Sequence, residues 1–175
     1  MDPSCSGVAL REDLPVLLAY VLSFVLIGIY WNNHHHMLAA VTRISGMTLW
    51  ANQHLLFWLS LIPVATAWMS QNHFPPIPVA AYGIVLLAAS LAYSVLQAAL
   101  LRTEDDRSVL AAAIGTDVKG KASNLMYGLG IGLSFANRWT GLAAYVAVAL
   151  IWFIPDRRVE RTLSGPHEDR SRIPP

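Results

Sequence analysis

The sequence predicts an all-α, polytopic membrane protein with five transmembrane helices. Of its 175 residues, 55% are hydrophobic and only 13% are charged, whereas a soluble domain carries about 25% charged residues. The apolar residues form five runs separated by short polar segments, and a helix that crosses a bilayer needs roughly 20 largely apolar residues. The basic residues lie in these short segments and form no exposed stripe, so no nucleic acid partner is expected.

The first predicted helix spans residues 14–42. It follows Glu12 and Asp13, whose carboxylates suit the N-terminus of a helix, and its apolar part ends at Trp31. The polar residues that come next keep a helical pattern, so the helix is expected to continue through them to Thr42. Residues 1–13 form a short N-terminal segment that contains no spanning run.

The second predicted helix spans residues 49–69 and the third spans residues 79–101. Pro63 lies inside the second helix, where its missing N–H predicts a kink unless neighbouring helices satisfy the freed carbonyl. The uncharged, proline-rich segment between the two helices predicts a tight turn outside the bilayer. Small residues such as Ala88, Ala89 and Ser90 in the third helix would let another helix approach closely.

The fourth and fifth predicted helices, residues 122–136 and 139–154, form a hairpin. Gly128 and Gly132 make a Gly-x-x-x-Gly pair in the fourth helix, a pattern typical of close helix packing. The preceding polar segment, residues 102–121, predicts either a solvated loop or a short amphipathic interfacial helix. Residues 159–175 are expected to form a disordered cytoplasmic tail.

The basic residues are distributed unevenly about the predicted spans. If all five helices cross, ten basic residues fall on one side and only Arg11 and Arg138 on the other, and such an excess marks the cytoplasmic side. The protein is therefore expected in the cell membrane, with its C-terminus in the cytoplasm. The ten residues are Arg43, Arg102, Arg107, Lys119, Lys121, Arg157, Arg158, Arg161, Arg170 and Arg172.

The polar residues at the end of the first predicted helix form the candidate functional site. The second helix begins on the side of the membrane where the first one ends, and it carries a stripe of indole and imidazole groups at i, i+4 and i+8. We expect an interhelical hydrogen-bond network of imidazole, amide and indole groups near the cytoplasmic side. Its members are Asn32, Asn33, His34, His35, His36, Trp50, His54 and Trp58, with Asn52 and Gln53 nearby.

The alternative interpretation of this cluster is a metal centre built from His34, His35, His36 and His54. Consecutive histidines fan around a helix at about 100° intervals, which is poor geometry for a metal site from one segment. The predicted spans also lack carboxylates. The sequence therefore predicts no metal, no cofactor and no catalytic residue, and hence no enzyme.

Four sequence blocks resemble the prokaryotic branch of the transmembrane protein 175 family, also described as domain of unknown function 1211. They are residues 20–24, 28–36, 49–66 and 150–158, and the similarity extends from about Asp13 to Arg161. The resemblance implies a six-helix repeat, four copies of which assemble around a potassium-selective pore in the membrane. It also implies that the first helix of each repeat lines the pore and carries an Arg-x-x-x-Phe-Ser-Asp motif.

The five predicted helices are similar to the second to sixth helices of that repeat. Residues 1–11 contain neither a spanning run nor Phe-Ser-Asp, so the first helix is expected to be missing and no pore-lining residue is assigned. The predicted function is that of a potassium channel subunit, homotetrameric by resemblance, whose conduction is impaired by the missing helix. The alternative is a non-conducting membrane scaffold or partner of full-length channel subunits.

Overall fold

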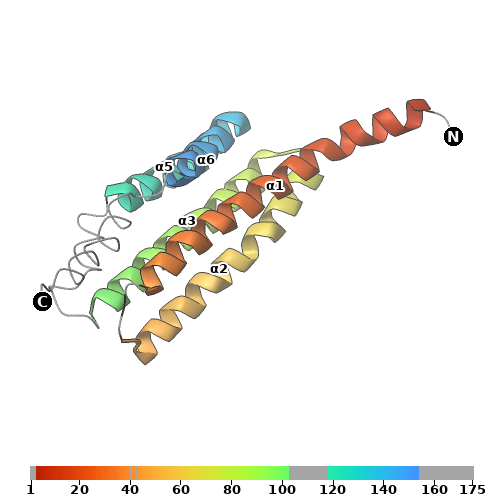
Figure 1. Ribbon diagram of the computed structural model, residues 1–175. Coiled ribbons are helices and arrows are strands. Elements are labelled where there is room, and N and C mark those ends of the chain that lie inside the picture. The colour runs from red at the N-terminus through yellow and green to blue at the C-terminus, as the bar shows by residue number, and fades with distance from the viewer. Residues whose placement is uncertain (1–2, 40, 42, 103–117, 154–175) are drawn as a thin grey trace, which may run out of the picture.

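The computed structural model describes residues 3–39, 41, 43–102 and 118–153. In these residues the chain forms five helices and no strand: α1 (Pro3–Ala39), α2 (Gly46–Gln71), α3 (Pro76–Leu101), α5 (Val118–Ala136) and α6 (Arg138–Phe153). Figure 1 shows α1, α2 and α3 running side by side, with α5 and α6 paired beside α3. The prediction of an all-α fold is confirmed for this part of the chain.

The helices begin earlier than the apolar runs do. α1 starts at Pro3 and not at residue 14, and α5 starts at Val118 and not at residue 122. The reason is that apolar runs mark the part of a helix suited to lipid, whereas caps and prolines decide where a helix begins. Ser45 caps α2 by accepting a hydrogen bond from the Thr48 N–H at 3.2 Å, and Pro76 opens α3, where a missing N–H costs little.

α1 ends at Ala39, short of the predicted end at residue 42. α6 is described as far as Phe153, and residue 154, where its end was predicted, lies outside the described residues. The predicted interfacial segment lies largely in residues 103–117, and the predicted tail lies in residues 159–175. Both lie outside the described residues.

Two groups of buried side chains hold the helices together. The larger one joins all five helices and includes Leu26 of α1, Ile62 of α2, Tyr82 of α3, Tyr127 of α5 and Tyr145 of α6. The smaller one, which we call the three-helix core, joins α1, α2 and α3 through Met37, Ala51, Leu55, Ala92, Leu96, Ala99 and Leu100. α3 packs against α2, α5 and α6 and is therefore the central helix.

α2 is one continuous helix that runs through Pro63. The turn after α2 places His73 and Phe74 at φ values of 57° and 58°, in the left-handed region, which costs roughly 1–2 kcal/mol per residue other than glycine. The Phe74 N–H bonds to the Met69 carbonyl at 3.0 Å, and its ring lies 5.9 Å from that of Trp139. These contacts offset the backbone cost and tie the α2–α3 turn to α6.

Glycines allow close packing where α3, α5 and α6 meet. The Tyr145 side chain occupies the space beside Gly83 of α3 and Gly130 of α5, and a Cβ on either glycine would overlap its ring or hydroxyl. A Cβ on Gly141 would lie 2.8 Å from the Gly130 carbonyl oxygen. In contrast, a Cβ on Gly128 or Gly132, the Gly-x-x-x-Gly pair of the sequence, would meet no described atom within 4 Å.

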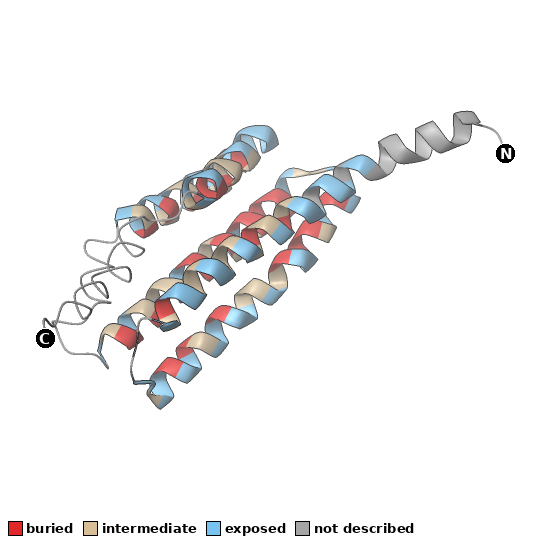
Figure 2. Cartoon of the chain, in the orientation of Figure 1, coloured by how far each residue is buried: buried red, intermediate tan, exposed pale blue. Residues whose placement is uncertain are grey.

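Many large apolar side chains are exposed, and Figure 2 shows exposed residues along the described helices. An exposed apolar surface of this kind is typical of lipid or protein contact. Two helices, Val16–Ala39 and Pro76–Leu101, are long and apolar enough to cross a membrane, and Arg138–Phe153 is apolar but shorter. Five crossings therefore stay a prediction, because α2 has Asn52, Gln53 and His54 in its first turns and α6 has only 16 residues.

Candidate functional site

One hydrogen bond joins the predicted polar cluster across two helices. His34 Nε2 of α1 lies 2.6 Å from Asn52 Oδ1 of α2, in a half-buried position. The acceptor is an amide oxygen, so His34 Nε2 carries the proton and donates it. The bond lies at the edge of the three-helix core. His34 is one turn before Met37 on α1, and Asn52 directly follows Ala51 on α2.

The other two histidines of α1 lie at the surface. His35 stacks on Trp31 of its own helix with ring centroids 5.3 Å apart and nearly parallel planes, and His36 meets His35 edge to face at 6.0 Å. Asn32 is also exposed. In the part of the chain that the structure describes, no hydrogen bond links these three side chains to α2.

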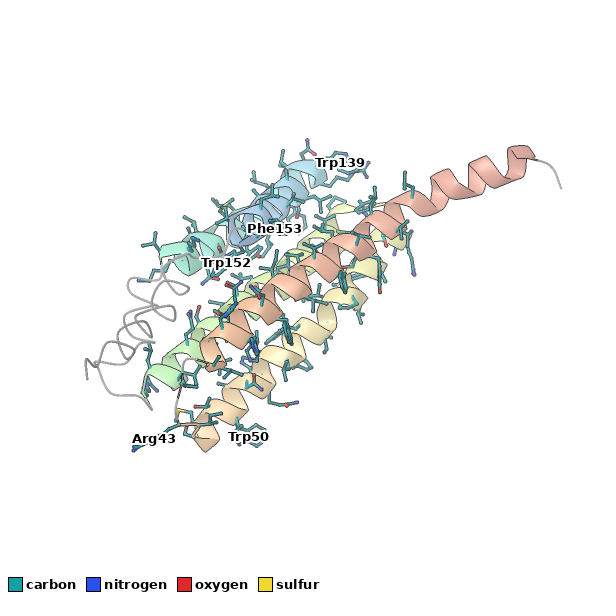
Figure 3. The ribbon with its side chains drawn as sticks, in the orientation of Figure 1. Arg43, Trp50, Trp139, Trp152 and Phe153 are labelled. Carbon is teal, nitrogen blue, oxygen red and sulfur yellow. The ribbon has the colours of Figure 1, made fainter. Side chains whose placement is uncertain are left out.

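The remaining members of the predicted network bond within their own helices or point outward. Trp58 donates its indole N–H to His54 Nε2 at 2.9 Å, an i, i+4 pair on α2, and Asn33 donates its amide to the Ile29 carbonyl at 2.8 Å. Trp50 is 78% exposed, and Figure 3 shows it projecting from the first turns of α2. Of the predicted interhelical network, the part of the chain that the structure describes therefore contains one bond, between His34 and Asn52.

The described residues contain no group of three or more His, Cys, Asp or Glu side chains placed to hold a metal ion. His34 faces Asn52 while His54 pairs with Trp58, so the histidines of α1 and α2 serve separate hydrogen bonds. The His34 bond therefore packs α1 against α2, and the His54 bond lies along α2 itself.

A second polar contact between α1 and α2 has no counterpart in the predicted site. Ser23 and Thr66 bond to each other through their hydroxyl groups, both fully buried, and Thr66 also donates to the Ile62 carbonyl at 2.8 Å. Because Thr66 uses its one hydroxyl proton on this carbonyl, the Ser23 hydroxyl is the donor to Thr66. The signal available in the sequence was a hydroxyl side chain within the apolar run of each of two neighbouring predicted helices, Ser23 in the first and Thr66 in the second.

Comparison with known proteins decides what kind of protein this is. The family model for the endosomal/lysosomal potassium channel TMEM175 matches residues 4–63. A potassium channel of Chryseobacterium sp. (strain P1-3) is 47% identical over 158 residues, which cover 90% of this chain and 82% of the relative. This chain belongs to the TMEM175 family. A potassium channel of Streptomyces collinus (strain DSM 40733 / Tue 365) is 32% identical over 151 residues, covering 82% of this chain and 73% of that protein.

No solved structure matches the chain. The TMEM175 family model spans α1 from its second residue and α2 as far as Pro63. It therefore contains both partners of the His34–Asn52 bond as well as Trp50, His54 and Trp58. The family is one of ion channels and not of enzymes, and membership places this chain among membrane proteins.

A double-mutant cycle tests whether the His34–Asn52 bond holds α1 to α2. His34→Leu and Asn52→Leu should each lower the apparent melting temperature in detergent, and their coupling energy should be about 0.6–1.7 kcal/mol, the range for hydrogen bonds between membrane helices. His35→Leu is the matched control, because His35 lies one residue away and makes no such bond. Strictly additive effects of His34→Leu and Asn52→Leu would show that the bond contributes nothing.

Proposed function

We propose that this chain is a subunit of an oligomeric potassium channel that conducts K⁺ across the cell membrane. The observation that carries the proposal is the 47% identity over 158 residues to a protein named a potassium channel. The family model and the second potassium channel relative support it. In this proposal all five described helices cross the bilayer, and the C-terminus lies in the cytoplasm, as the distribution of basic residues predicts.

The outer face of α1 supports assembly into an oligomer. Leu17, Val21, Phe24 and Gly28 repeat at intervals of three and four residues, and all four are exposed, so they form one unpartnered apolar stripe. The resemblance assigns the pore to a helix that has no counterpart among the described helices. We therefore propose that conduction is complete only when the assembly includes such a helix.

Potassium flux into liposomes tests this function. The purified chain is reconstituted alone and, in a second set of vesicles, together with the Chryseobacterium relative. We expect the K⁺ flux to exceed both the K⁺ flux of protein-free vesicles and the Na⁺ flux. In the mixed vesicles the K⁺ flux should exceed the sum of the fluxes that the two proteins give separately. Vesicles in which a folded chain neither conducts nor changes the flux of the relative would contradict the proposal.

A non-conducting partner is the second candidate, and the exposed stripe on α1 is the observation that favours it. Under this alternative the chain alone gives no flux, whereas its addition to the relative lowers or alters the flux of that channel. Chemical cross-linking from Leu17→Cys shows whether the two proteins meet through α1. The inward-facing Leu26→Cys is the matched control, because Leu26 is 2% exposed.

A further inference from the structure

A small cavity lies where α1 meets α3, α5 and α6. It has a volume of about 30 Å³, and a cavity needs about 10–15 Å³ of such volume to hold one water molecule. It therefore has room for about two. Most of its lining is apolar or aromatic, and its polar lining residues are Tyr30, Asn33, Ser90, Tyr93, Ser94 and Tyr127.

The polar atoms of this lining offer both acceptors and donors. Asn33 spends its amide N–H on the Ile29 carbonyl, and its Oδ1 has no partner within the described residues. Ser94 donates to the Ser90 carbonyl at 3.1 Å, which leaves its oxygen able to accept. The Tyr30 hydroxyl approaches those of Ser90 and Tyr127, and one hydroxyl of such a group can donate into the cavity.

This pattern selects among possible ligands. A cation is disfavoured because the lining has no carboxylate, and burying an unpaired charge costs far more than burying a hydrogen-bonded neutral group. An apolar ligand would offer Asn33 Oδ1 no donor. Water has two donors, two acceptor lone pairs and the required size.

We propose that this cavity is an internal hydration site, in which about two water molecules bridge Asn33 of α1 to the hydroxyl groups of α3 and α5. Bridging waters are nearly as favourable as direct hydrogen bonds. The site gives α1 a polar attachment to α3 and α5, in addition to the His34–Asn52 bond to α2. It is independent of whether the chain conducts potassium.

Hydroxyl-radical labelling by X-ray radiolysis, read by mass spectrometry on the full chain in detergent, tests the proposal. Radicals form from water, so buried side chains are labelled where bound water touches them. Tyr127 is 2% exposed and lines the cavity, whereas the apolar side chain of Met69, at 1%, is equally buried and does not line it. We expect labelling of Tyr127, corrected for the intrinsic reactivity of each side chain, to be several-fold faster than labelling of Met69.

Two variants strengthen the test. Ser90→Leu fills the cavity and should reduce labelling of Tyr127 to the level of Met69, while Ser60→Leu, at an exposed position, should leave it unchanged. If Ser90→Leu does not fold, Ser94→Ala removes an acceptor with little change in volume and should also slow the labelling. Equal corrected labelling of Tyr127 and Met69 in the unmodified protein would overturn the proposal, whatever the variants do.

Discussion

Gly83→Ala is expected to lower the stability of the helix bundle by about 3 kcal/mol, the upper end of the range for overpacking a core. A Cβ at this position would overlap the Tyr145 hydroxyl, lie 2.5 Å from its ring carbon Cζ and lie 2.8 Å from Ile131 Cγ1. Tyr145 cannot move aside easily, because it also fills the space beside Gly130 and packs against Tyr82 with ring centroids 5.9 Å apart. The apparent melting temperature in detergent measures the loss.

Gly132→Ala is the matched control for Gly83→Ala. Both positions are glycines inside helices, but a Cβ on Gly132 meets nothing within 4 Å, and alanine is favoured over glycine in a helix by about 1 kcal/mol. The control variant should therefore be as stable as the unmodified protein or more stable. Tyr145→Phe in the Gly83→Ala background should restore part of the loss, since it removes the overlapping oxygen. An unchanged melting temperature for Gly83→Ala would refute the packing described for Tyr145.

Leu55→Ala should produce the second large effect, a loss of about 2 kcal/mol, at the low end of the range for buried leucines. Leu55 is fully buried in the three-helix core, against Met37, Leu96 and Leu100. The low end applies because lipid or detergent is as apolar as leucine, so the loss comes from packing contacts and the cavity that remains. Melting temperatures in one detergent, compared at equal protein concentration, give the result.

Leu56→Ala provides the comparison for Leu55→Ala. Leu56 is the next residue on α2 and is 44% exposed, so truncating it opens no internal cavity. Its effect should stay within about 0.5 kcal/mol, as is usual for surface positions. If both variants lose the same stability, then α2 does not present Leu55 to the three-helix core in the way the structure shows.

The sequence predicted the positions of the helices because each of these predictions depended on a local pattern. Apolar runs of about 20 residues predicted where helices lie, and the blocks shared with the TMEM175 family predicted the class of protein that the comparisons confirmed. The helix ends differed from prediction at Pro3 and Val118. Apolar periodicity does not extend to these ends, so the apolar runs did not mark them.

The sequence predicted which residues lie near the candidate site, but only part of how they bond to one another. Eight residues near the end of α1 and the start of α2 were expected to bond across the two helices, and His34 does bond to Asn52. Trp50 points outward and His54 bonds to Trp58 on its own helix. Spacing along a helix shows which residues share a face, but the rotation of each helix about its axis decides which face meets the neighbour.

The same distinction applies to the whole protein. The sequence alone determined an apolar, all-helical chain of the TMEM175 family, because hydrophobic run lengths and shared blocks are properties of the chain itself. Only the tertiary structure decided that Gly83, Gly130 and Gly141, and not Gly128 and Gly132, permit close packing. It also brought Asn33, Ser94 and Tyr127 from three helices to one cavity. Such contacts depend on how the helices are rotated and placed against each other, which no local pattern specifies.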